Sequence, residues 1–501
     1  MKDGIYKMLQ PNQLTVAFIW HMHQPYYKDG LTGQYMMPWV RLHAIKDYLD
    51  MVLLLEEFPN VSFTVNLVPS LMEQIEDYIN PNTHDQQSKL TIQDENIYTA
   101  DDKRHILERC FDANVHTKIA LISHYESLYQ RRERLLHQYG LVSTIPELVL
   151  NEAFTDQEYA DICALMNLVW FDPMWLDKKR ELKQLFEQGQ NYSLEDRKRI
   201  IQIQRDIIAE ILPTYKRLQD EGRLDVTTTP YYHPILPLLV NSDHAKRAMP
   251  NSVLPLEAFV APEDAEMQLK MAVKKYESVF GQKPQGIWPS EQSVSPEVVD
   301  LISKFGFEWL VTDEGILAKS LGLGRFDKDG LGNFVHPEVC CRPYSFRNIN
   351  MLFRHLTLSD LIGFHYDKLS PQQAVDDLYY RLKDIHSRCN ASGHQYPIVT
   401  IALDGENCWE NYAEDGLAFM RALYYRLSLD EELSVSTVSK YFNQLPKIES
   451  QQVIRPLQQL HSGSWINSDY HIWIGDTLKN AGWVLLKKTR DDLVFFENQN
   501  K

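Results

Sequence analysis

Residues 397–410 read PIVTIALDGENCWE, and this stretch decides the fold class. The run from Ile398 to Leu403 is apolar or β-branched without alternation, which is typical of a strand buried on both faces of a parallel sheet. Asp404 and Gly405 follow at once. Enzymes built on parallel strands carry catalytic groups at the carboxyl ends of those strands, although an ordinary solvated Asp-Gly turn has the same sequence. The stretch therefore predicts a strand that ends at a candidate catalytic carboxylate.

Six further segments have strand character, and helical patterns separate most of them. After the first of these segments, for example, Leu42, Ile45 and Leu49 recur at helical spacing. Strands that alternate with helices predict an α/β fold with a parallel sheet. The six predicted strands are residues 14–20, 61–67, 224–229, 286–288, 309–312 and 349–353.

Polar residues stand at the ends of nearly all the predicted strands. The carboxyl ends of parallel strands meet at one edge of a sheet or at one mouth of a barrel, so we expect these side chains to converge. In chain order, the strand ends carry His21 and His23, Asn66, His233, Glu291, Asp313, Arg354 and Asp404.

Two parts of the chain depart from this alternation. Residues from about 80 to 222 are charged and helix-rich, which predicts a helical insertion over the sheet. Within it, Ser193-Leu194-Glu195-Asp196 is typical of a helix-starting capping box. The strand pattern fades after the seventh strand, so we expect a catalytic domain of residues 1–412 and a C-terminal helical domain of residues 413–501.

Composition excludes several classes of protein. The 501 residues carry a formal net charge of −17, which argues against nucleic-acid binding. The sequence has no apolar span of about 18 residues, as a membrane helix would require, and the N-terminus lacks the apolar core of a signal peptide. Six cysteines without CxxC spacing predict neither a zinc site nor a disulfide framework. We therefore expect a cytoplasmic protein without nucleic-acid or membrane partners, and the oligomeric state stays open.

Glu291 and Asp404 are the two strand-end carboxylates that suggest glycoside cleavage. One carboxyl group must protonate the departing oxygen, while the other attacks the anomeric carbon or activates water. Trp288 and Trp409 lie close to them in sequence, and aromatic rings can stack on the apolar faces of sugars. Four other strand-end residues would form hydrogen bonds with sugar hydroxyls: His21, His23, His233 and Arg354.

Two alternatives remain open on these residues. His21 and His23 lie two apart at a strand end, so both could face the metal of a hydrolase, with His233 and Asp404 completing the ligands. We nevertheless expect no metal or other cofactor, because the pattern does not specify those further ligands. A non-catalytic glucan-binding regulatory protein is the other alternative, and the presence of both carboxylates favours an enzyme over it.

Five short segments, in order, resemble the characteristic regions of glycoside hydrolase family 57, especially its amylopullulanase-like and α-amylase-like members. The resemblance extends through most of the chain. The segments are His21 to Pro25 (HMHQP), Asn66 to Gln74 (NLVPSLMEQ), Gly286 to Glu297 (GIWPSEQSVSPE), Leu403 to Glu410 (LDGENCWE) and Trp465 to Gly475 (WINSDYHIWIG).

This resemblance implies a retaining enzyme that acts on α-glucans or maltodextrins without a metal. It implies an incomplete (β/α)7 barrel followed by a helical domain. Glu291 would be the nucleophile and Asp404 the general acid/base, with His23, Trp465 and Trp473 as sugar contacts. Cleavage of α-1,4 or α-1,6 bonds, 4-α-glucanotransfer and branching all stay open, because loops at the barrel mouth decide between them.

Overall fold

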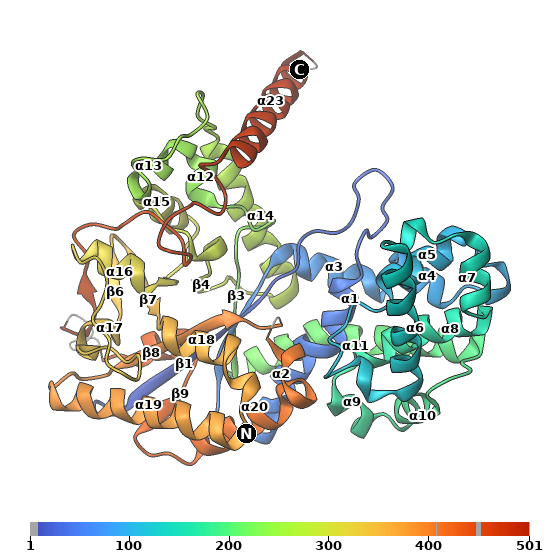
Figure 1. The fold of residues 1–501 in the computed structure, drawn as a ribbon. Helices are drawn as coiled ribbons and strands as arrows, with labels where there is room; N and C mark the ends of the chain where they lie inside the picture. Colours follow the sequence, from blue (N-terminus) through green and yellow to red (C-terminus); the bar gives the residue numbers. More distant parts are fainter. Residues whose placement is uncertain (1–8, 407, 447–451, 500–501) are drawn as a thin grey trace.

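Seven parallel strands form a nearly closed barrel in the computed structural model, which describes residues 9–406, 408–446 and 452–499 (Figure 1). Neighbouring strands pair in the order β4-β5-β7-β8-β1-β2-β3, and a single bridge between Thr228 and Ile287 joins β3 to β4. The barrel strands are β1 (Leu14–Met22), β2 (Phe63–Leu67), β3 (Leu224–Thr227), β4 (Gly286–Ile287), β5 (Trp309–Asp313), β7 (Ile349–Arg354) and β8 (Ile398–Asp404).

These seven strands confirm the predicted α/β barrel. Boundaries differ by one or two residues; β1, for example, runs on to Met22 because His21 and Met22 still pair with Asn66 and Leu67 of β2. The sequence did not predict three short strands beside the barrel, since two or three residues show no periodicity. They are β6 (Tyr344–Phe346), β9 (Leu433–Val435) and β10 (Arg455–Pro456).

The register of the central strands places three polar residues side by side. β1 pairs with β8 from Thr15 opposite Ile398 up to His21 opposite Asp404. On its other side, β1 places His21 opposite Asn66 of β2. The predicted convergence of polar strand ends therefore holds for these three strands.

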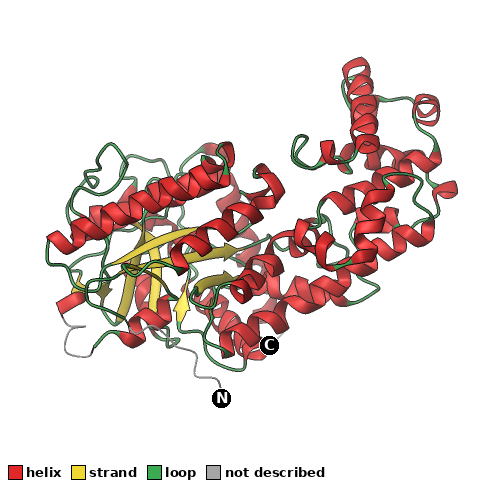
Figure 2. Cartoon of the chain, turned by 90° about the horizontal axis from the view of Figure 1, so that it is seen from below, coloured by secondary structure: helices red, strands yellow, loops and turns green. Residues whose placement is uncertain are grey.

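Helices cover the outside of the barrel (Figure 2). Local sequence signals mark where such helices begin. At the start of α19, for example, Ser370 and Gln373 form a reciprocal capping box, and Pro371 is the first residue of the helix. Outside the insertion, the helices up to β8 are α1 (Trp39–His43), α2 (Leu49–Glu57), α3 (Pro69–Ile79), α12 (Leu236–Val240), α13 (Ala245–Ala248), α14 (Pro262–Phe280), α15 (Pro296–Ser303), α16 (Glu314–Ser320), α17 (Pro337–Cys340), α18 (Leu356–Phe364) and α19 (Pro371–Ala391).

The helical insertion lies beside the barrel, on the right in Figure 1. Its long helix α11 begins with the predicted capping box, in which Ser193 and Asp196 bond each other's backbone N–H. A buried ion pair between Arg41 of α1 and Asp85, which caps α4, joins the insertion to the barrel. Its helices are α4 (Gln86–Thr91), α5 (Ala100–Arg109), α6 (Ser123–Tyr139), α7 (Glu147–Ala153), α8 (Asp156–Val169), α9 (Pro173–Lys178), α10 (Arg180–Gln188) and α11 (Leu194–Asp220).

Residues after 412 contribute helices α20 (Leu417–Ser428), α21 (Val438–Gln444) and α23 (Thr477–Gln499). The segment is not only helical, because β9 pairs with β1 and β10 pairs with β6. The division into domains at residue 412 stays a prediction. Within the described ranges, no helix is both long enough and apolar enough to cross a membrane.

Gly286 of β4 provides a test of the packing inside the barrel. A Cβ atom there would lie 2.1 Å from Cζ2 of Trp309, a residue that is 1% exposed. We expect Gly286→Ala to lower the free energy of unfolding by about 1–3 kcal/mol, because the buried indole has little room to move. Urea denaturation measures the change.

Gly30→Ala is the matched control, since a Cβ at Gly30 meets nothing within 4 Å. Its stability should stay within about 0.5 kcal/mol of the wild type. An equal stability of both variants would contradict the close packing of β4 on Trp309.

Candidate active site

The mouth of the barrel encloses a cavity of about 970 Å³ that contains both candidate carboxylates. Residues from five barrel strands or from the loops that follow them reach it, together with the loop that precedes α23. Of the predicted site residues, the cavity is lined by His21, His23, Glu291, Arg354, Asp404 and Trp465.

Glu291 lies in a turn directly after the two-residue strand β4. Its backbone is left-handed (φ 55°), as is that of Gln292 (φ 50°), and this conformation is uncommon for residues other than glycine. Trp465 forms two hydrogen bonds with Glu291: its indole Nε1 donates to Oε2 at 2.8 Å, and its backbone N–H donates to the Glu291 carbonyl at 3.1 Å. The loop that carries Trp465 therefore fixes both the backbone and the carboxylate of Glu291.

The pKa of Glu291 is raised above its ordinary value, mainly by burial. The indole N–H of Trp465 lowers this pKa, because it stabilises the charged carboxylate, while the negative charge of Asp404 raises it. His233 Nδ1 lies 3.9 Å from Oε1 on the other side. Glu291 and Asp404 are thus close enough to interact electrostatically within one cavity.

Asp404 ends β8, and Gly405 lets the chain pass close to β1. Gly405 N–H donates to the His21 carbonyl at 2.8 Å, and a Cβ atom on Gly405 would lie 2.4 Å from Sδ of Met22. A larger residue would push β8 away from β1. The small residue after the candidate acid therefore serves the strand pairing that places Asp404.

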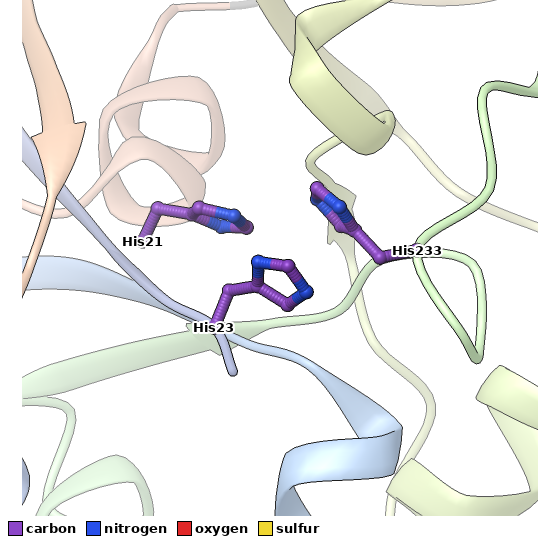
Figure 3. Close-up of side chains that lie close together, drawn as sticks. All are labelled: His21, His23 and His233. Carbon is purple, nitrogen blue, oxygen red and sulfur yellow. The ribbon is translucent and has the colours of Figure 1, made fainter. Parts of the chain in front are cut away.

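Three imidazoles, those of His21, His23 and His233, lie close together (Figure 3). His21 Nδ1–H donates to Asn66 Oδ1 at 2.7 Å, which fixes its tautomer, and its ring stacks on Trp288 at 4.6 Å. The rings of His23 and His233 stack at 4.1 Å. Burial lowers the pKa of His21 to about 4 and that of His23 to about 3. All three rings are neutral near pH 7, because burial also lowers the pKa of His233 well below its ordinary value.

These three histidines are, among the residues that the structure describes, the group whose ligand atoms come close enough to hold a metal ion, within 4.8 Å of one another. A metal requires ring nitrogens that point at one site from about 2.0–2.1 Å, in the plane of each ring. The rings of His23 and His233 instead lie face to face, inclined by 28°. A shared metal would require these rings to turn.

Four predicted sugar contacts do not line this cavity. Trp288 is fully buried behind His21, and Trp409 is 2% exposed and donates its indole N–H to the Gly405 carbonyl. Trp473 packs in a separate cluster with Trp483, while His233 stacks on His23 at the edge of the site. Direct sugar contact by these four residues stays a prediction.

The cavity also contains acidic and aromatic residues beyond the predicted site residues. Asp313 ends a predicted strand, so the pattern that marks Glu291 could also have marked Asp313 as a site residue. No periodicity marks the others, because they follow the strand ends in loops and helices. The additional lining residues include Asp313, Glu314, Asp360, Phe364 and Glu406.

Comparison with known proteins identifies the family. The model of glycosyl hydrolase family 57 matches residues 17–455 of this chain. The chain belongs to glycosyl hydrolase family 57. This membership confirms the resemblance of the five short segments, and four of the five lie wholly within the matched range.

Individual relatives of this family 57 chain are distant. Alpha-amylase 1 of Dictyoglomus thermophilum is 24% identical over 129 residues, which cover 26% of this chain and only 15% of the amylase. The GH57-type branching enzyme of Pyrococcus horikoshii has 17% identity and a TM-score of 0.56, covering 96% of this chain and 78% of that enzyme. An α-amylase of Thermotoga maritima has 13% identity and a TM-score of 0.50, covering 90% and 77%. The likenesses to the two solved structures show a shared fold.

The lowered pKa of His21 predicts that the free energy of unfolding depends on pH. Its pKa is about 4 in the folded chain against an ordinary value of 6.5, so the unfolded chain binds more protons between these pH values. The contribution of neutral His21 to the free energy of unfolding is complete above about pH 6.5 and is lost as the pH falls towards 4. In this range the free energy of unfolding changes by about 1.4 kcal/mol per pH unit for each extra proton that the unfolded chain binds. We expect His21→Gln to decrease this slope in urea denaturation between pH 6.5 and 4.

His137→Gln is the control, because its side chain is exposed. We expect this variant to retain the wild-type slope. A His21→Gln variant with the wild-type slope would show that His21 takes up its proton equally in the folded and unfolded chains.

Proposed function

We propose that this chain is a retaining α-glucan-active enzyme that cleaves α-1,4 or α-1,6 glucosidic bonds through a glycosyl-enzyme intermediate. The observation that carries the proposal is the pair Glu291 and Asp404, which lie at the ends of two barrel strands in one cavity and interact electrostatically. Membership in glycosyl hydrolase family 57 supports the same reaction class.

Glu291 is the nucleophile in the proposed mechanism. Its carboxylate forms a bond to the anomeric carbon while the bond from that carbon to the leaving oxygen breaks. Protonated Asp404 transfers its proton to the leaving oxygen. Asp404, now ionised, then removes a proton from water or from a sugar hydroxyl, whose oxygen displaces Glu291 from the anomeric carbon.

Neutral histidines suit a site that binds sugars. The proton of His21 on Nδ1 is engaged by Asn66, so Nε2 is free to accept a hydrogen bond from a sugar hydroxyl. Because these imidazoles are uncharged, they present donors and acceptors without adding a positive charge beside Glu291. Hydrogen bonds of this kind discriminate strongly between hydroxyl configurations, because a mismatched sugar leaves a buried group unpaired.

Substitution of the two carboxylates tests the proposal. We expect Glu291→Ala and Asp404→Ala each to lower kcat on maltodextrins by several orders of magnitude, because each removes a group that bonds or protonates the reacting atoms. Reducing-end release together with chromatography of the product chains measures the rate of hydrolysis and of transfer, and calorimetric titration with maltodextrin checks that binding survives. Wild-type turnover by either variant would end this assignment, while binding without turnover by the wild-type protein would favour the regulatory alternative.

Chelation tests the alternative of a metal hydrolase. We expect full activity on maltodextrin after exhaustive dialysis against EDTA, because no step of the proposed mechanism uses a metal. Activity that disappears on dialysis and returns with added Zn²⁺ would instead support catalysis through His21 and His23.

Analysis of the products distinguishes hydrolysis from glucan transfer, and α-1,4 from α-1,6 cleavage. The similarities include both a branching enzyme and α-amylases, so hydrolysis and glucan transfer are both candidates. Incubation with amylose, pullulan and maltotriose separates them: shorter linear chains indicate α-1,4 hydrolysis, maltotriose released from pullulan indicates α-1,6 hydrolysis, and chains longer than the substrate indicate transfer.

A further inference from the structure

We propose that Trp465 is a positioning residue for the nucleophile: its indole N–H holds one oxygen of Glu291, and the guanidinium of Arg354 clamps the indole. This inference rests on the proposed function, because it assigns a role within the same site. It goes beyond the expectation that Trp465 and Arg354 contact sugar.

The contact between Trp465 and Glu291 has the geometry of a specific hydrogen bond. Indole Nε1 donates to Oε2 at 2.8 Å, within the range of charge-assisted bonds. A second bond, from the Trp465 backbone N–H to the Glu291 carbonyl, holds the two residues in a fixed relation. With Oε2 engaged by the indole, the other oxygen, Oε1, is the one that remains for attack on the anomeric carbon.

Arg354 covers one face of the Trp465 ring. Its guanidinium carbon lies 4.9 Å from the ring centroid, a distance typical of a cation–π contact. Asp360 accepts a hydrogen bond from Arg354 Nη2 at 2.5 Å, and Asp313 Oδ2 lies 4.0 Å from Nη1. These contacts hold the guanidinium at the ring, so less of the indole is available for stacking on a sugar.

Trp288 supports the indole from another direction. The two indole rings meet at 87° with centroids 5.4 Å apart, and Trp288 is fully buried. Trp465 is therefore held by a buried aromatic ring, a buried arginine and two hydrogen bonds to Glu291. An indole with this many protein contacts suits a fixed support better than an adaptable sugar platform.

The hydrogen bond from Trp465 also lowers the pKa of Glu291, which is opposite to the effect of burial. Burial raises the pKa of Glu291, whereas a nucleophile must be ionised to attack. The indole N–H stabilises the ionised form. Other titratable or charged groups beside this assembly are His233, which faces Oε1, and His21, which stacks on Trp288. Arg354 itself pairs with Asp313 and Asp360.

The experiment replaces the donor while keeping an aromatic ring. We expect Trp465→Phe to lower kcat about 10- to 100-fold on maltodextrin, the size of effect expected for a lost hydrogen bond to a charged group, with KM within about twofold of the wild type. The acidic limb of kcat/KM against pH should move to higher pH, because the pKa of Glu291 rises when the N–H donor is lost. Arg354→Met should change kcat in the same direction by a smaller factor.

Trp175→Phe is the matched control, because it also removes a buried indole bond, from Trp175 Nε1 to the Ile45 carbonyl at 3.0 Å, but in the helical insertion. Its kcat and pH profile should stay as in the wild type. If Trp465→Phe does not fold, replacement of Trp465 by 3-benzothienylalanine keeps the shape of tryptophan and removes only the N–H.

The outcomes separate this inference from the proposed function. A raised KM with wild-type kcat and an unmoved acidic limb in Trp465→Phe would overturn the positioning role and make Trp465 a sugar contact. A raised KM alone in Arg354→Met would overturn the clamp. If Glu291→Ala were active, the proposed function itself would fail, whereas an inactive Glu291→Ala beside a fully active Trp465→Phe would remove only this inference.

Discussion

The in-register pairing of β1 with β8 is the constraint on which the rest of the site depends. It places His21 opposite Asp404, while the pairing of β1 with β2 places His21 opposite Asn66. A shift of one residue would turn every side chain of a strand to its other face. Because the strands are buried on both sides, such a shift would be costly, so the packing that stabilises the barrel also sets the positions of the polar groups at its mouth.

Burial then shifts the pKa values of these polar groups. In water, histidines and carboxylates would titrate near their ordinary pKa values, but at the barrel mouth burial lowers the pKa of His21 and raises that of Glu291. Neutral imidazoles can accept and donate hydrogen bonds to uncharged sugars. The carboxylate needs a compensating donor, and the indole of Trp465 is that donor.

Prediction from the sequence succeeded where one strong physical signal acts alone. Doubly buried strands such as Ile398–Asp404 are continuous apolar runs, and a polar residue at their end marks the barrel mouth. Strands of two or three residues, such as β9, carry no such signal. Proximity in sequence does not by itself place a side chain at the cavity: Trp409 is near Asp404 in the chain and packs among Trp20 and Tyr412 in the core. The bond from Trp465 to Glu291 joins positions 174 residues apart, which no local pattern predicts.

The separation of these groups along the chain has a consequence for synthesis. β1 finds its partner β8 only after nearly 400 residues have been made, and Glu291 meets Trp465 later still. At about 5–20 residues per second, a ribosome needs on the order of a minute to make the chain from β1 to Trp465. Until β8 is made, the first barrel strand has an unpaired edge, and the nascent protein has an incomplete sheet that could pair with other chains. The helical insertion precedes β3 to β8 in the chain, so it is made before most of the barrel strands.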